Sequence, residues 1–179
     1  MTAASLIRLY DAIYAAAGKL RTSRNLKQTL LVISDSAGHN SRRSFSDLSK
    51  ELKTSEVQIY AVIFDEAEMW AYSNITQGGE RRKRISGDAN RLDRAAIQEL
   101  ALKSGGTSNF PTTASGQELY RIHKRIASEM REFYTLSFYP ADAADGKWHE
   151  LKIGLRSVKG SRSFALTYRQ GYQSPLLKR

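Results

Sequence analysis

The sequence contains no cysteine at all. This excludes disulfide bonds, thiolate metal sites and cysteine-based catalysis together, but leaves the compartment open. No stretch approaches the roughly 18 consecutive apolar residues that a membrane-spanning helix requires. The start of the chain also lacks the basic and then apolar order of a secretory signal. The residues therefore predict a chain that folds in water and carries no recognisable targeting signal.

The chain has fewer acidic than basic residues. The chain has 179 residues, enough for one domain with or without a small appendage, and 28 Lys and Arg stand against 18 Asp and Glu. The net charge of +10 makes nucleic acid, an anionic lipid surface or an acidic protein a conceivable partner. Residues 147–179 alone carry a local charge of +7. The charge is thus concentrated toward the end of the chain.

Apolar spacing predicts helices that alternate with strands. Recurrence at three and four residues predicts helices over 3–20, 44–53, 90–104 and 115–133. Capping boxes open two of them, at Ser44 and at Ser115. Continuous apolar runs predict buried strands over 29–33 and 57–64, and a short strand over 107–110. Strands followed by helices indicate an α/β fold with a mainly parallel sheet.

The end of the chain has a different pattern. Partial alternation predicts antiparallel strands over 134–139, 148–155 and 163–168. Their aromatic side chains are expected to form a small core. The predicted organisation is therefore an α/β domain over 1–132 followed by a β-strand extension over 133–179. The range 65–90 is too long for an ordinary connection and is expected to be a functional loop or a mobile segment.

Asp35 is the most informative polar residue. It follows a buried strand, and ligands of open α/β sheets bind beyond the carboxyl ends of the strands. With the hydroxyls of Ser34 and Ser36, its carboxylate offers hard oxygen ligands suited to Mg²⁺ or another divalent cation. Asp65, after the next strand, is expected at the same edge. The alternative is that Asp35 only caps its own loop through backbone hydrogen bonds.

An ordered series of segments resembles the bacterial von Willebrand factor type A-related proteins. The segments are LYDAIY at 9–14, LLVISD at 30–35, VQIYAV at 57–62, LALKSGG at 100–106, YTLSFYP at 134–140, DGKWH at 145–149 and RQGY at 169–172. The resemblance covers nearly the whole chain and is weakest over 65–90. It implies a three-layer, Rossmann-like α/β/α domain, and export of the full-length form.

The resemblance also implies a metal-ion-dependent adhesion site, completed by a carboxylate of a protein partner. Of its ligand pattern only Asp35 matches. The Asp-x-Ser-x-Ser loop is absent because the chain looks truncated at the N-terminus, and Ile7 stands where the family has a threonine. We therefore expect weak or absent cation binding. Partner contacts are expected at this edge from four residues: Ser34, Ser36, His39 and Asn40.

Truncation implies an incomplete sheet. Its free edge and uncovered face would need a protein ligand or a missing N-terminal segment, and would otherwise promote oligomerisation. The first hypothesis is thus a protein-interaction module with an incomplete adhesion site.

The second hypothesis is an electropositive binder of nucleic acid or an anionic surface. It would use the basic tail and a loop run that consists of Arg81, Arg82, Lys83 and Arg84. An enzyme is not expected, because no base or nucleophile accompanies Asp35 and the three histidines match no metalloprotease spacing.

Overall fold

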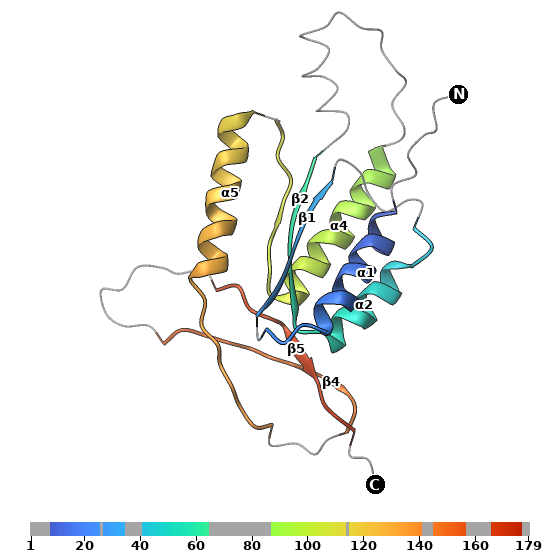
Figure 1. Cartoon of the computed structure of the whole chain (residues 1–179), viewed down its shortest axis with the longest axis vertical. Coiled ribbons are helices and arrows are strands. Elements are labelled where there is room, and N and C mark those ends of the chain that lie inside the picture. Colours follow the sequence, from blue (N-terminus) through green and yellow to red (C-terminus); the bar gives the residue numbers. More distant parts are fainter. Residues whose placement is uncertain are drawn as a thin grey trace, which may run out of the picture.

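The computed structural model describes residues 8–25, 27–34, 41–64, 87–113, 115–140, 145–156 and 166–176. Helices and strands alternate over most of this length (Figure 1). The elements are α1 (Leu9–Arg21), β1 (Gln28–Ser34), α2 (Phe45–Thr54), β2 (Val57–Ile63), α4 (Gly87–Ser104), β3 (Ser108–Asn109), α5 (Gly116–Arg131), β4 (Trp148–Glu150) and β5 (Gly171–Gln173). The α/β fold class predicted from the sequence is confirmed.

Three parallel strands form the sheet in the order β1-β2-β3. β1 pairs with β2 along its whole length, from Gln28 opposite Val57 to Ser34 opposite Ile63. β3 is short and pairs with the end of β2, where Ala61 lies opposite Ser108. Within the described ranges no strand pairs with the outer edge of β1. β1 is therefore one edge strand of the described sheet, and the short β3 is the other.

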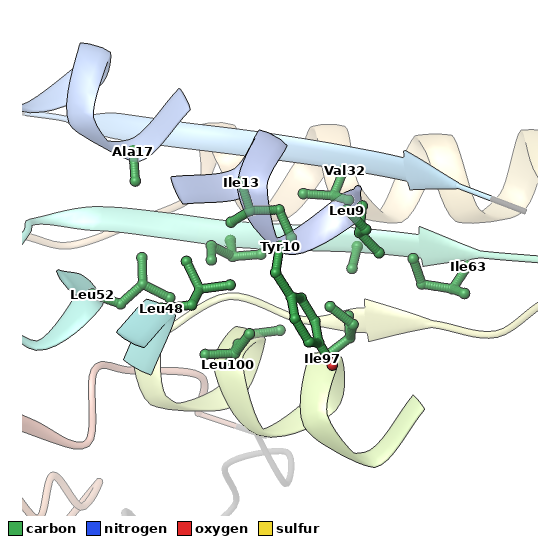
Figure 2. Close-up of a cluster of buried hydrophobic side chains, with 13 residues drawn as sticks. Leu9, Tyr10, Ile13, Ala17, Val32, Leu48, Leu52, Ile63, Ile97 and Leu100 are labelled. Atoms are coloured by element: carbon green, nitrogen blue, oxygen red, sulfur yellow. The ribbon is translucent and has the colours of Figure 1, made fainter. Parts of the chain in front are cut away.

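One face of the sheet carries the main core. α1, α2 and α4 lie on this face (Figure 1), and their apolar stripes meet the alternate side chains of β1 and β2 that point to them. Figure 2 shows how the Tyr10 ring reaches from α1 toward Ile97 of α4. The buried cluster consists of Leu9, Tyr10, Ile13, Ala17, Val32, Leu48, Leu52, Ile59, Ala61, Ile63, Ile97, Leu100 and Ala101. This apolar burial is the principal term that stabilises the fold.

The opposite face is covered by α5. Ile126 of this helix packs on Tyr60 and Val62 of β2, and Ile122 and Met130 lie at the border of this cluster. The helix spans 16 residues with its apolar side chains on one stripe, as the spacing predicts. The sheet thus lies between two helical layers, with the smaller core on the α5 side.

Two polar caps fix helix starts. The capping box at α2 is complete, because the Ser44 side chain accepts from the Asp47 backbone N–H and the Asp47 carboxylate accepts from the Ser44 N–H. At α5 only the serine half forms, in which the Ser115 hydroxyl accepts from the Glu118 backbone N–H. The Glu118 carboxylate accepts instead from the backbone and hydroxyl of Thr113. The first capping box is confirmed, and the second is replaced by a wider turn.

The connection from α4 to β3 passes close to β2. A Cβ on Gly106 would lie 1.9 Å from the carbonyl oxygen of Ile59, so only glycine fits. The preceding Gly105 has a φ of +82°, which L side chains rarely adopt. Ser104 adds a buried hydrogen bond between the end of α4 and β2, because its hydroxyl accepts from the Ile59 N–H at 2.9 Å. The Gly-Gly pair therefore ends α4, as predicted, and also seats β3 against β2.

The C-terminal part differs from its prediction. β4 and β5 form an antiparallel pair, but the strand predicted over 148–155 ends at Glu150. Residues 134–139 form no strand, and their aromatic side chains are largely exposed instead of forming a small core. Of the strand predicted over 163–168, residues 166–168 are not a strand and the rest lie outside the described ranges. β5 had not been predicted.

The turn before β4 is closed by side chains. Asp145 accepts from the Lys147 backbone N–H at 2.8 Å and lies 3.0 Å from His149 Nε2. These hydrogen bonds, above all the one from His149, lower the pKa of Asp145. The His149 ring also stacks on Tyr172 of β5. The turn thus stabilises the pairing of β4 with β5.

In the described part of the chain, none of the helices is both long and apolar enough to cross a membrane.

Candidate functional site

Ser34 is the single residue of the predicted site that the structure describes. It ends β1 at the carboxyl edge of the sheet, and its carbonyl accepts from the Phe64 N–H at 2.8 Å. The other predicted site residues lie outside the described ranges: Asp35, Ser36, His39, Asn40, Asp65, Arg81, Arg82, Lys83 and Arg84. Among the residues that are described, no cluster of three or more His, Asp or Glu side chains could hold a metal ion.

The described surroundings of this edge are built by the start of α1. The Tyr10 N–H donates to Ser41 Oγ at 2.9 Å. Asp11 accepts from the backbone N–H groups of Arg42 and Arg43 at 3.0 and 2.9 Å. These two hydrogen bonds lower the pKa of Asp11. The first turn of α1 therefore holds the segment that leads into α2.

The carboxylates of this region are occupied, whereas its guanidinium groups are exposed. Asp11 uses both oxygens on the backbone, and Ser44 hydrogen bonds lower the pKa of Asp47. Arg8, Arg42 and Arg43 are exposed, and the Arg43 guanidinium lies 4.4 Å from the centroid of the Tyr14 ring. The described side chains near the edge therefore favour an acidic group over a cation.

An apolar surface lies beside this edge on the α5 face of the sheet. Leu31 and Ile33 are opposite Tyr60 and Val62 in the parallel register, so all four side chains point to the same face. Tyr60 and Val62 are 3% and 6% exposed, whereas Leu31 and Ile33 are 44% and 65% exposed. α5 thus covers β2 and leaves β1 uncovered. Leu31 and Ile33 are called the open face of β1 below.

The two flanks of α5 differ in chemistry. Thr107 Oγ1, next to β3, donates to Glu129 at 3.1 Å, and Arg125 donates to Asn109 at the end of β3. Glu129 and Arg125 therefore mark the flank toward β3. At 100° per residue, Glu118 falls on the same flank. Both acidic residues of the helix thus lie away from β1.

The other flank of α5 faces the open face of β1. Helical spacing places on it Leu119, Tyr120, Ala127, Met130 and the polar His123, with Arg131 and Lys124 farther round toward the outer side of the helix. Tyr120, Lys124 and Arg131 are exposed. No carboxylate of the helix is on this flank. The open face of β1 is consequently bordered by basic side chains.

Lys27 closes one end of this surface. It lies just before β1, and its ammonium donates to the carbonyl of Met130 near the end of α5. The ammonium also lies 3.5 Å from the centroid of the Phe133 ring. Desolvation lowers the pKa of Lys27. The start of β1 and the end of α5 are therefore joined directly.

Arg169 attaches the C-terminal tail to the α/β layers. Its guanidinium donates to the carbonyl of Lys53, in the last turn of α2, at 2.7 Å. It also donates to the carbonyl of Ser55, directly after that helix. Its Nε donates to the carbonyl of Gly171 at 2.9 Å. One cation of the basic tail is thus a structural cap of α2, since helix ends leave carbonyls without partners.

No family model, curated protein or solved structure matches the chain. Its function is therefore inferred from the residues that the structure describes. Sequence reasoning missed the roles of Asp11, Lys27 and Arg169. The prediction placed Asp11 in the middle of a helix over 3–20, whereas α1 begins at Leu9 and Asp11 lies in its first turn, where an acidic residue is favourable.

Proposed function

We propose that the chain is a protein-interaction module of the von Willebrand type A kind. The partner binds at the carboxyl edge of the sheet, around Ser34 and Asp35, and over the adjoining open face of β1. The observation that carries this proposal is the exposure of Leu31 and Ile33 beside their buried neighbours on β2. Apolar neighbours exposed together on a sheet face favour a protein contact.

The energetics favour coverage of this surface. Burying one Leu or Ile side chain fully contributes about 1.5 to 3 kcal/mol. β1 reads QTLLVIS and contains neither a charged residue nor a proline. Those are the residues that usually protect an edge strand from unwanted pairing. A specific partner would bury both the apolar side chains and the edge.

A divalent cation has at most a minor part in this proposal. Asp35 with Ser34 and Ser36 supplies only part of the oxygen ligands that Mg²⁺ needs. The exposed guanidinium groups of Arg42 and Arg43, which lie in the segment leading into α2, oppose a bound cation there. Partner binding should therefore persist in EDTA. The proposed function requires no catalytic step.

Site-specific photo-crosslinking tests the proposal. A photoreactive phenylalanine analogue replaces Ile33 in one variant and Leu102, which is 50% exposed on α4, in a matched variant. After irradiation in the native host, we expect one discrete protein adduct from position 33 and none from position 102. Equal adducts from both positions, or none from position 33, would contradict the proposal.

The competing proposal is an electropositive binder of nucleic acid or an anionic surface. Lys147, Lys152 and Arg156 are exposed in the described tail, and the net charge is +10. Arg169 is not available to it, because its guanidinium is bound by backbone carbonyls. A single-stranded oligonucleotide whose affinity falls steeply with salt, and falls further when Arg81–Arg84 are neutralised, would support this alternative.

A further inference from the structure

We infer that the open face of β1 takes an amphipathic helix with an acidic polar flank, supplied by a protein partner and lying alongside α5. The inference rests on the proposed function and narrows it to one kind of partner segment. It is carried by two independent observations, the uncovered apolar side chains of β1 and the uneven distribution of charge around α5.

The first observation is steric. Leu31 and Ile33 point from β1 to the same face as Tyr60 and Val62, which α5 covers. Helices on one face of a sheet pack about 8 to 10 Å apart and neighbouring strands about 5 Å apart, so a second helix beside α5 would lie along the outer edge of β1, with one side over Leu31 and Ile33. Leu31 and Ile33 are about 7 Å apart along the strand, close to the 6 Å between helix residues four apart. Two apolar side chains of the incoming helix would therefore match them.

The second observation is electrostatic. Glu118 and Glu129 lie on the β3 flank of α5, whereas Arg131 and Lys124 lie on the β1 side of its outer surface, about 140° and 160° around the helix from Ile126. Both basic side chains are exposed. A helix seated over β1 would present one polar flank to them. Carboxylates on that flank complement the charge, and basic residues there would be repelled.

A second copy of the chain fits this surface less well. Each copy carries a net charge of +10, so close approach is opposed by repulsion. Antiparallel pairing of two β1 edges would extend the sheet but leave Leu31 and Ile33 of both copies uncovered, because edge pairing adds nothing above the face. An acidic helix from another protein covers the face and offsets the charge.

The probe is a fluorescent peptide of about 16 residues, the length of α5. It has leucine at helical spacing and glutamate on both flanks. A twin peptide carries lysine in place of every glutamate, and a third has the acidic composition in scrambled order. Fluorescence anisotropy measures the dissociation constant of each peptide with the full chain. We expect the ordered acidic peptide to bind at least about tenfold more tightly than either control peptide.

Variants locate the binding. Ile33→Ser should weaken the acidic peptide by about tenfold or more, whereas Leu102→Ser on α4 should leave it unchanged. Lys124→Glu with Arg131→Glu should weaken the acidic peptide and strengthen the lysine twin. Lys152→Glu, a matched charge change in the exposed tail, should have a much smaller effect. Circular dichroism of each variant checks that the fold is kept.

Three results would overturn the inference. The first is equal binding of the ordered and scrambled acidic peptides, which means nonspecific attraction to a basic chain. The second is binding that is insensitive to Ile33→Ser in a folded variant. The third is a dimer in analytical ultracentrifugation that Ile33→Ser dissociates, which assigns the surface to a second copy. If position 33 still crosslinks to a protein while the peptide test fails, the proposed function is kept. The inference that the partner supplies an acidic amphipathic helix is then wrong.

Discussion

Ile33 and Val62 are neighbours in register on adjacent parallel strands, yet 65% of Ile33 is exposed and only 6% of Val62. The two side chains have similar chemistry and point to the same face of the sheet. They differ because Ile126 of α5 packs on Val62 and leaves Ile33 uncovered. The difference between these neighbours marks where the described packing of the α5 face ends.

Truncation of isoleucine should therefore have different costs at two positions in the same sheet. Ile59→Ala, at a side chain that is 1% exposed, should lower the free energy of unfolding by about 2 to 5 kcal/mol. Ile33→Ala should lower it by less than about 1 kcal/mol, because most of that side chain already contacts water. Urea denaturation of both variants measures the difference. Equal losses would mean that Ile33 is covered in the isolated chain.

Gly106 should not tolerate a side chain. In Gly106→Ala the new Cβ would meet the Ile59 carbonyl, so β3 would have to move away from β2. We expect a loss of more than about 3 kcal/mol or failure to fold. Gly18→Ala in α1 is the matched control, since nothing lies within 4 Å of its Cβ position. That variant should be stabilised by about 0.5 to 1 kcal/mol in thermal or urea unfolding.

Removal of the Arg169 guanidinium should weaken the attachment of the tail. Arg169→Met leaves the carbonyls of Lys53 and Ser55 without their charged donor. The expected cost is about 2 kcal/mol or more. Hydrogen exchange at the end of α2 and in β5 should become faster. Arg156→Met, at an exposed position of the same tail, serves as the control and should change neither measurement. Unchanged exchange in Arg169→Met would contradict the capping role.

Asp11 should make the free energy of unfolding depend on pH in the acidic range. Its pKa in the folded chain is held below the ordinary value of 3.8 by the backbone N–H groups of Arg42 and Arg43. As pH falls, the unfolded state takes up the proton first, so this contribution to stability is complete above pH 3.8 and is lost as pH falls through the folded pKa.

Asp11→Asn should consequently be less stable than the parent chain at neutral pH, and the two should converge at low pH. Urea titrations at a series of pH values measure both curves. Glu150→Gln, an exposed carboxyl on β4, should keep the pH dependence of the parent chain. Parallel curves for Asp11→Asn and the parent would show that the carboxylate does not hold the segment before α2.

The alternating helices and strands were predictable because their signals are local. The apolar run over 29–33 became β1 at Gln28–Ser34, and the pattern over 44–53 became α2 at Phe45–Thr54. The prediction that β1 is buried on both faces is wrong, because Leu31 and Ile33 are 44% and 65% exposed. The order β1-β2-β3 agrees with the tendency of strands that are consecutive in the sequence to lie side by side.

The C-terminal strands were less predictable because their pairing is not local. The alternation of 134–139 indicates a strand, but the segment has no described strand partner and Tyr134 is 96% exposed. β5 contains Gly171, which weakens the sequence signal for a strand. A Cβ at Gly171 would meet the Trp148 ring and the His149 carbonyl, so the pairing itself requires glycine.

The surroundings of the site could be predicted only in part. The position of Ser34 at the carboxyl edge followed from the strand pattern. The uncovered state of Leu31 and Ile33 did not, since an apolar run gives no information on which helix packs over it. The hydrogen bonds of Asp11 to residues 42 and 43 join segments about 30 residues apart, so they require the folded chain.

The hydrogen bonds of Arg169 to the end of α2 should keep the C-terminal tail associated with the rest of the protein after proteolytic cleavage. Residues 133–140, which follow α5, are exposed and have no regular secondary structure, a situation that proteases favour. A single cut there would break the backbone while the guanidinium contacts and the contact of Trp148 with Lys53 of α2 remained. The two polypeptides would then elute together in gel filtration and separate only in denaturant.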